Sequence, residues 1–217
     1  MSKDWVRWHQ EYDAQGSSLG RRLEVVRRDL RRALGTSPSE PDGTRRLISI
    51  CAGDGRDVLP VIAEHDRRVR ALLVELDPTL ARRARETADD LGLSSVEIRT
   101  ADAGDAGTYL DVRPAHILLA CGVFGNVGDD DVRRTVAALP TLLVAGGIVI
   151  WTRARADDGS DPSQWVRTLF AEHGFTELSF TAPDDARFRV GMHRLAGAVR
   201  HGALSDRLFT FRASGAG

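Results

Sequence analysis

Apolar runs alternate with amphipathic segments along most of the chain, and this alternation predicts its secondary structure. Residues 47–51 (LISIC), 71–76 (ALLVEL) and 115–121 (AHILLAC) are almost wholly apolar, which is typical of strands buried on both faces of a parallel sheet. A weaker run at 96–100 and another at 147–152 (GIVIWT) predict two further strands.

Helical segments separate these strands. Polar and apolar residues mixed at helical spacing predict helices over residues 57–65, 78–91, 131–143 and 162–173. Strands that alternate with helices in this way indicate an α/β fold, with helices covering both faces of the sheet.

The two ends of the chain depart from this alternation. Residues 177–181 and 188–195 predict two strands whose connection is too short for a crossover helix, so we expect this last pair to be antiparallel. At the other end, Leu23, Val26, Leu30 and Leu34 recur at spacings of three and four and predict an amphipathic helix. We therefore divide the chain into an N-terminal helical segment, residues 1–46, and an α/β domain, residues 47–217.

Composition and charge narrow the class of protein. The 217 residues are 42% hydrophobic and 28% charged, which is typical of one globular domain and excludes collagen-like or wholly disordered chains. The formal net charge of −1 provides no global basic field for nucleic acid or an anionic membrane. No apolar run approaches the ~18 residues of a membrane span. The N-terminus lacks the apolar stretch of a signal peptide, so we expect a cytoplasmic protein.

The two cysteines, Cys51 and Cys121, are too few for a disulfide framework or a zinc cluster, and no metal site is predicted. In a reducing compartment both thiols should be free.

The first candidate ligand-binding motif follows the first strand, at residues 51–57 (CAGDGRD). Gly53 and Gly55, with Ala52 beside them, allow a tight turn and a close approach of the backbone to a ligand. Asp57 is a candidate cap for the next helix, and Pro60 suits that helix's first turn.

Three more motifs follow strand ends. Glu75 lies twenty residues after Gly55 and could accept hydrogen bonds from ribose hydroxyls, whereas Asp77 before Pro78 is predicted to cap a helix. Asp102 follows the third strand, where its carboxylate could accept an adenine amino group. The fourth motif is residues 121–126 (CGVFGN), in which the glycines keep the strand end open. Carboxyl ends of parallel strands are where open α/β sheets bind ligands.

Together these motifs resemble those of the class I S-adenosylmethionine-dependent methyltransferases over residues 45–196. The resemblance implies a Rossmann-like three-layer α/β/α sandwich with a seven-stranded, mostly parallel sheet whose last strand is antiparallel. It also implies S-adenosyl-L-methionine as the cofactor. The cofactor-binding residues implied are Ala52, Gly53, Gly55, Glu75, Leu76, Asp102, Ala103, Gly122, Val123 and Tyr12. The chain departs from the family at Ser49, where an acid is usual, and at Cys51, where a glycine is usual.

The resemblance also gives the N-terminal segment a role as a lid over the cofactor, which would bring aromatic residues near a sulfonium. The candidates are Trp5, Trp8, His9 and Tyr12. At the end of the fifth strand, Arg153 could bind an acidic substrate or a surface carboxylate, and His193 is better explained as a core residue than as a base. No catalytic residue is assigned, because methyl transfer from a sulfonium depends mainly on positioning and on exclusion of water.

The sequence thus predicts a methyltransferase that acts on a small molecule, with the acceptor atom and the oligomeric state unassigned. A non-catalytic S-adenosylmethionine-binding protein is the alternative from another class. A NAD-dependent oxidoreductase is less favoured, since its fingerprint requires a third glycine where Val58 stands. Cys51 and Cys121 end strands that are neighbours in this family, so we expect them close together and unbridged.

Overall fold

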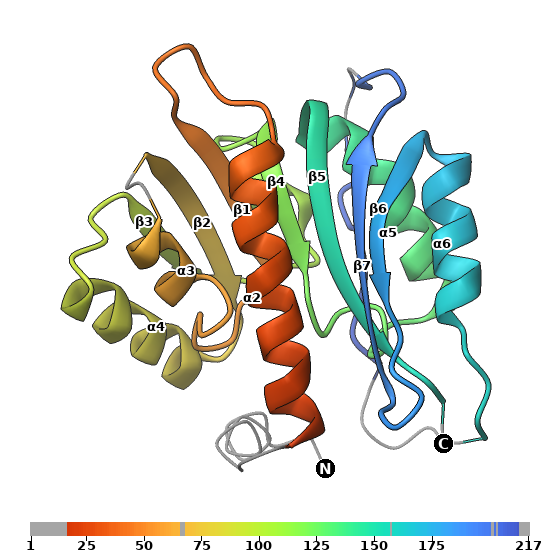
Figure 1. Ribbon diagram of the computed structural model, residues 1–217. Coiled ribbons are helices and arrows are strands. Elements are labelled where there is room, and N and C mark those ends of the chain that lie inside the picture. The colour runs from red at the N-terminus through yellow and green to blue at the C-terminus, as the bar shows by residue number, and fades with distance from the viewer. Residues whose placement is uncertain (1–16, 66–67, 157, 201, 203, 213–217) are drawn as a thin grey trace.

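The computed structural model describes residues 17–65, 68–156, 158–200, 202 and 204–212. Within it, seven strands form one sheet (Figure 1). The strands are β1 (Arg45–Ile50), β2 (Val69–Glu75), β3 (Val96–Thr100), β4 (Ala115–Ala120), β5 (Leu143–Ala154), β6 (Phe175–Thr181) and β7 (Phe188–Leu195). Their order across the sheet is β3-β2-β1-β4-β5-β7-β6.

Strand β7 runs against the rest of the sheet. It pairs antiparallel with β5 on one side and with β6 on the other, whereas the pairs among β1, β2, β3, β4 and β5 are parallel. The predicted seven-stranded sheet with an antiparallel last strand is therefore confirmed.

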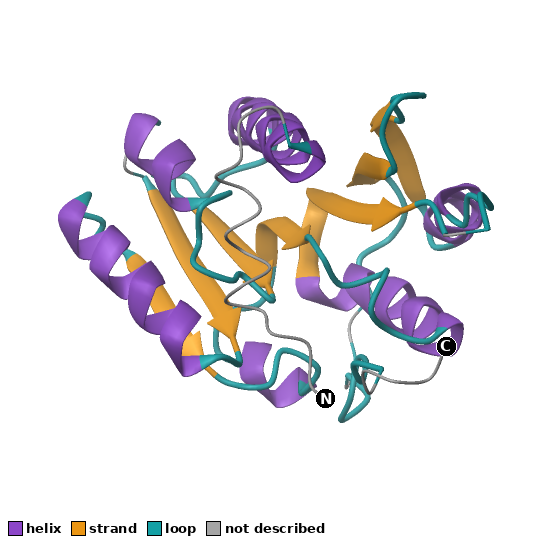
Figure 2. Ribbon diagram, turned by 90° about the horizontal axis from the view of Figure 1, so that it is seen from below, coloured by secondary structure: helices purple, strands orange, loops and turns teal. Residues whose placement is uncertain are grey.

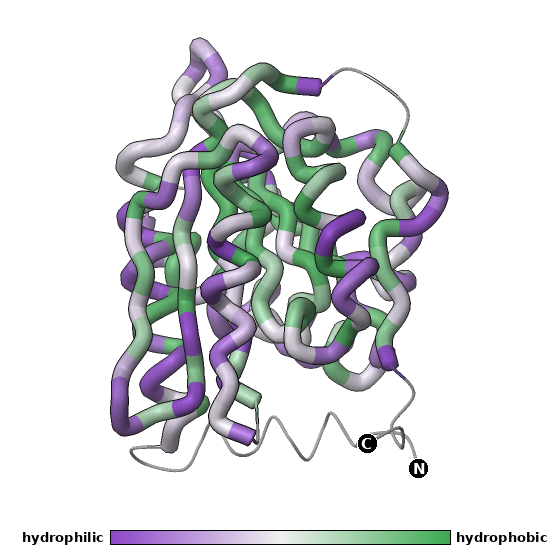
Figure 3. Tube along the Cα trace, turned by 90° about the vertical axis from the view of Figure 1, so that its right-hand side faces the viewer, coloured by the Kyte–Doolittle hydropathy of each residue, from purple (hydrophilic) through white to green (hydrophobic). Residues whose placement is uncertain are grey.

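Helices cover both faces of this sheet, as Figure 2 shows from below. They are α2 (Ser18–Thr36), α3 (Leu59–Glu64), α4 (Pro78–Asp90), the 3-10 helix η2 (Ala106–Tyr109), α5 (Asp129–Leu142) and α6 (Ser163–Glu172). Residues of α2, α3 and α4 share one core cluster with the sheet, and those of η2, α5 and α6 share another. The strands between the two layers are the most hydrophobic part of the trace (Figure 3).

Helix α2 belongs to the layer that also contains α3 and α4. Val26, Leu30 and Leu34 are buried against the sheet as their spacing predicts, while Leu23 is half-buried. The predicted N-terminal segment, residues 1–46, includes this helix, but the helix's side chains pack in one cluster with residues of β1, β4 and β7. The first 16 residues lie outside the described part of the chain, so the division at residue 46 stays a prediction.

The sequence pattern did not predict a role for residues 204–212, here called the C-terminal strap. Leu208 and Phe209 of the strap are fully buried in the core cluster that includes η2 and α5. Its backbone is held by hydrogen bonds from Leu208 N to Gly104 O (2.8 Å) and from Arg212 N to Asn126 O (2.9 Å). The strap therefore joins the loop after β3 to the loop after β4.

No helix in the described part of the chain is long and apolar enough to cross a membrane.

Candidate active site

The loop after β1 contains three residues in the left-handed backbone conformation, and two of them are glycines. Gly53 and Gly55 have positive φ values of 59° and 73°, and Cys51 has a φ of 55°, the one positive φ at a non-glycine residue among those described. A left-handed conformation is unfavourable for a residue with a Cβ. Cys51 therefore stands where the backbone itself favours glycine, which is the residue usual in the family that the sequence resembles.

Gly55 and Gly122 differ in what surrounds them. A Cβ added at Gly55 would lie 2.7 Å from Leu59 Cδ1 and 3.1 Å from Leu73 Cδ2, so Gly55 allows the loop to pack on α3 and β2. A Cβ added at Gly122 would meet no atom within 4 Å, although the φ of Gly122 is 77°. The backbone after β4 is thus open toward the end of the sheet, where a ligand could approach it.

Glu75 connects two loops. Its Oε2 accepts a hydrogen bond from Gly53 N and its Oε1 accepts one from Asp77 N, both at 2.8 Å. Asp77 caps α4 as predicted, since its Oδ1 accepts from Thr79 N (2.8 Å) and Leu80 N (3.1 Å). The next residue, Leu76, is 65% exposed, an unusual position for a large apolar side chain. The end of β2 therefore presents a fixed carboxylate beside an exposed apolar surface.

Asp102 lies where the sequence predicted, but it already has partners. Its Oδ1 accepts a hydrogen bond from Gly104 N at 2.8 Å, and its Oδ2 forms an ion pair with Arg207 of the C-terminal strap. Arg207 is 105 residues away in sequence, and no local pattern could have indicated the contact. Ala103 is buried, and its carbonyl accepts a hydrogen bond from the hydroxyl of Tyr109 at 2.6 Å.

The loop after β4 is fixed to its neighbours by polar contacts. Gly122 N donates to Thr152 Oγ1 at 2.8 Å, and Asn126 Nδ2 donates to Gly122 O at 2.6 Å. Val123 is fully buried in the core, so its side chain has no exposed surface for a ligand and a contact would involve its backbone. The sequence pattern placed Asn126 in the motif at residues 121–126 but did not predict either contact. The contact of Asn126 is local, whereas that of Thr152 depends on β4 and β5 being neighbours.

Asp57 does not cap α3, contrary to the prediction. The N-cap of α3 is Val58, with no side-chain hydrogen bond, because the helix begins later than its sequence suggested. The Oδ1 atom of Asp57 is buried without a hydrogen-bond donor among the described residues. Burial raises the pKa of Asp57 to about 6, and the negative charge of Asp54 contributes to the increase.

Helix α2 supports the β1 loop from the side. Arg27 Nε and Nη2 donate to Arg56 O at 3.0 and 2.7 Å, and Arg56 in turn pairs with Asp54. The spacing of apolar residues in this helix did not predict a role for Arg27. Its role becomes visible only when α2 packs beside the loop.

Both cysteines are free, as predicted. Cys51 packs against the core cluster that contains α5 and α6, whereas Cys121 packs against the one that contains α2. Burial raises the pKa of both thiols, so neither is a thiolate nucleophile at neutral pH.

Strands β5 and β7 carry the remaining candidate residues. His193 is buried, its Nδ1 accepts from Trp151 Nε1 at 3.1 Å, and burial lowers its pKa to about 4, so it is a neutral core residue rather than a base. The side chain of Arg153 is 10% exposed, and its Nη2 lies 3.6 Å from Asp129 Oδ1. Tyr12, with Trp5, Trp8 and His9, lies outside the described residues, and its predicted contact with a ligand stays a prediction. Among the described residues, no group of three or more His, Cys, Asp or Glu side chains is arranged to hold a metal ion.

Comparisons with known proteins agree with this geometry. Residues 19–156 match the model of a family described as "Putative methyltransferase". No curated protein matches the chain.

Solved structures share the fold at low identity. An O-methyltransferase family protein from Burkholderia thailandensis aligns with a TM-score of 0.64 and 16% identity, over 81% of this chain and 55% of that one. The chain therefore spans about half the length of that protein. The magnesium protoporphyrin IX methyltransferase from Synechocystis PCC 6803, solved with bound SAH, aligns with a TM-score of 0.66 and 13% identity, over 88% of this chain and 93% of that one. An RNA methyltransferase from Salinibacter ruber, in complex with S-adenosyl-L-homocysteine, aligns with a TM-score of 0.51 and 19% identity, over 80% of this chain and 94% of that one.

Proposed function

The chain belongs to this methyltransferase family, and from that premise we propose that it is an S-adenosylmethionine-dependent methyltransferase with a small-molecule acceptor. The observation that carries the proposal is the position of Glu75. Its carboxylate lies at the end of β2, bound to Gly53 N of the β1 loop and to Asp77 N. A carboxylate at this place in a doubly wound sheet is suited to ribose hydroxyls.

The residues present fit the cofactor. The open backbone at Gly122 leaves room beside the β1 loop, and the exposed Leu76 offers an apolar surface for a purine ring. The unsatisfied Oδ1 of Asp57 is a buried acceptor without a donor among the described residues, and the ammonium group of the methionine moiety would supply one. Leu76, Glu75 and Asp57 would thus hold the adenine, the ribose and the amino-acid end, respectively.

Bound S-adenosylmethionine would supply an activated methyl group on its sulfonium, so the chain itself need not generate the electrophile. The chain's own part is to bind, orient and exclude water. Glu75 at the end of β2 and Gly122 in the loop after β4 are both held by hydrogen bonds, and methyl transfer needs this preorganisation. No general base is required where the acceptor is already deprotonated.

A small acceptor is favoured by the charge of the chain. The formal net charge is −1, without the excess of cations that nucleic-acid binding normally requires. Among similar structures, one acts on a porphyrin and one is named an RNA methyltransferase, so the fold permits either class. The cytoplasmic location expected from the sequence stays a prediction.

Two measurements test the proposal. Titration calorimetry should detect binding of S-adenosylhomocysteine and no binding of NAD. Incubation with methyl-labelled S-adenosylmethionine and a metabolite extract should then label a low-molecular-weight product. Binding of NAD without S-adenosylhomocysteine would contradict the cofactor, and binding without any labelled product would indicate a non-catalytic binding protein.

A further inference from the structure

Among the described residues, Arg153 at the end of β5 has no carboxylate within good hydrogen-bond distance. Strand β5 pairs with β4 up to Trp151 and Ala120, and the next residue of β5, Thr152, accepts a hydrogen bond from Gly122 N. Arg153 therefore stands one residue beyond the contact between β5 and the open loop that follows β4. In the proposed function this is the end of the sheet next to the transferred methyl group.

The guanidinium of Arg153 is buried but poorly satisfied. Its side chain is 10% exposed, and its Nη1 is buried with no hydrogen-bond partner among the described residues. The nearest carboxylate is that of Asp129, whose Oδ1 lies 3.6 Å from Nη2, too far for a good hydrogen bond, on a side chain that is 65% exposed. A buried charge without a hydrogen-bonded counter-charge is unfavourable, and its retention requires an explanation.

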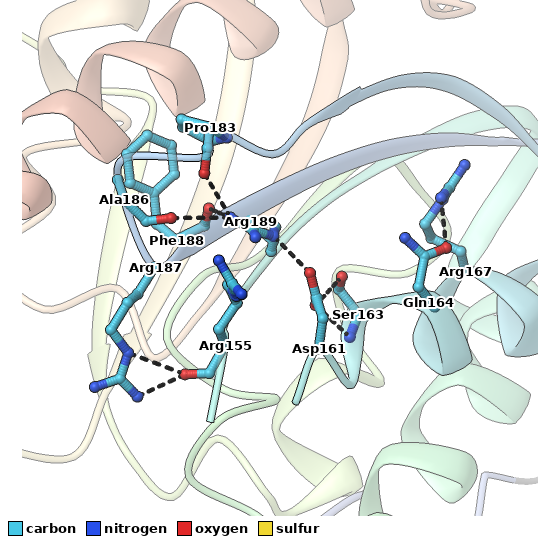
Figure 4. Close-up of polar contacts among 10 residues, drawn as sticks. All are labelled: Arg155, Asp161, Ser163, Gln164, Arg167, Pro183, Ala186, Arg187, Phe188 and Arg189. Carbon is cyan, nitrogen blue, oxygen red and sulfur yellow. Dashed lines mark hydrogen bonds and ion pairs between the residues drawn. The ribbon is translucent and has the colours of Figure 1, made fainter. Parts of the chain in front are cut away.

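The other described groups near Arg153 do not supply an anion for it. Asp161 accepts hydrogen bonds from Arg189 Nε (2.7 Å) and from Ser163, as Figure 4 shows. The Trp165 ring, whose centroid lies 5.9 Å from Arg153 Cζ, offers no acceptor oxygen because its indole N–H can only donate. Arg133 lies over the same ring and is a cation. Burial, together with the positive charge of Arg212, lowers the pKa of Arg153.

The loops beside Arg153 are fixed in place. Arg187 Nε and Nη2 donate to Arg155 O at 3.2 and 2.6 Å, and Arg189 Nη1 binds three carbonyl groups near the start of β7 (Figure 4). These contacts join the residues after β5 to β7, so the end of β5 is a rigid place for a recognition group.

We propose that Arg153 binds an anionic group of the methyl acceptor, a carboxylate or a phosphate, that is separate from the atom that is methylated. The inference rests on the proposed function. Two oxygens of such a group would satisfy the guanidinium, which is shaped for bidentate contact with carboxylate or phosphate. Arg153 then determines which acceptors bind and takes no part in moving the methyl group or the proton.

The test has two parts. The first measures the charge of the methylated product, and the second measures how substitutions at Arg153 change methylation. Wild-type protein is incubated with methyl-labelled S-adenosylmethionine and a metabolite extract, and the labelled products are separated by anion exchange. We expect products that are retained as anions, and treatment with alkaline phosphatase distinguishes a phosphate monoester, which loses its charge, from a carboxylate, which does not.

The variants are Arg153→Met and Arg153→Lys, with Arg155→Met as the matched control on the neighbouring loop. Arg153→Met should reduce labelling at least tenfold at unchanged affinity for S-adenosylhomocysteine, Arg153→Lys should retain part of the activity, and Arg155→Met should match the wild type. If Arg153→Met does not fold, the charge of the product made by the wild-type protein and the activity of Arg153→Lys test the proposal instead.

Labelled products that are neutral or cationic overturn this inference alone, as does an Arg153→Met variant that labels anions as well as the wild type does. A wild-type protein that binds no S-adenosylhomocysteine, or binds it without labelling anything, overturns the proposed function and this inference with it.

Discussion

At the scale of single residues, the candidate site depends on a few carboxylates whose roles differ although their sequence positions look alike. Glu75 holds two loops through backbone N–H groups, and Asp77, two residues further on, caps a helix. Asp57 is buried, and its Oδ1 has no donor among the described residues. The difference lies in which backbone groups each carboxylate can reach, and each role leads to a separate measurement.

Substitution of Glu75 should affect the cofactor, and substitution of Asp77 should affect stability. Glu75→Ala removes the carboxylate that would accept both ribose hydroxyls, so it should weaken binding of S-adenosylhomocysteine by about 2–4 kcal/mol. Asp77→Ala removes the cap of α4 and should lower the free energy of unfolding by about 1 kcal/mol with little change in binding. Titration calorimetry and urea unfolding measure the two effects, and an Asp77→Ala variant that loses binding while Glu75→Ala retains it would reverse the assignment.

Asp57 should make the protein less stable as the pH rises. Its pKa in the folded state is about 6 against an ordinary 3.8, so the folded protein binds more protons than the unfolded chain between these values. Stability from this group is therefore lost as the pH rises through that window, by up to about 3 kcal/mol.

The variant Asp57→Asn should be more stable than the wild type at about pH 7 and nearly equal to it at about pH 4, as measured by urea unfolding. It should also bind S-adenosylhomocysteine more weakly, because it lacks the charge proposed for the ammonium group. An equal difference between the two proteins at both pH values would show that Asp57 does not titrate in this range.

At the scale of elements, the C-terminal strap replaces a helix. The connection between β3 and β4 contains only the short 3-10 helix η2, which leaves part of that face of the sheet uncovered. Leu208 and Phe209 fill the space, and Arg207 reaches Asp102 from the same segment. The ion pair is half-exposed and adds little to stability, so the buried side chains hold the strap and the pair orients Asp102.

Gly104→Ala should displace the strap. An added Cβ would lie 2.2 Å from Phe209 O, a backbone atom that cannot move aside cheaply, so we expect a loss of about 1–3 kcal/mol in the free energy of unfolding. The strap should also become more sensitive to limited proteolysis. Gly125→Ala is the control, because a Cβ there would meet no atom within 4 Å. Equal stability of the two variants would mean that the strap does not depend on close approach at Gly104.

At the scale of the whole molecule, the strand order brings the four loops of the candidate site to one end of the sheet. Strands β1 and β4 are neighbours at its centre, and the change of direction along the order occurs between them. Ligands bind at such a switch point in open α/β sheets. Helix α2 completes the layer on one face and supports the β1 loop through Arg27.

Removal of residues 1–15 should therefore leave a folded domain. Helix α2 would keep its N-cap, in which Ser17 Oγ accepts from Gly20 N at 2.9 Å, and its buried face would remain in the core. We expect a cooperative thermal transition close to that of the full chain, with weaker binding of S-adenosylhomocysteine and no methyl transfer if the segment is a lid. Turnover equal to that of the full chain would contradict the lid role.

The sequence alone determined the strands, the helices, the α/β class and the acids and glycines at the strand ends, because periodicity and strand-end composition are local properties of the chain. It placed Glu75 and Asp77 in different roles, since an acid before a proline marks a helix start.

Only the tertiary structure decided which distant groups meet. Arg207 binds Asp102, Arg27 holds the loop at Arg56, and Leu208 and Phe209 fill the core. These contacts join segments whose separation in the chain has no periodic signature. They exist because the order of the sheet and the packing of its two layers bring particular loops together.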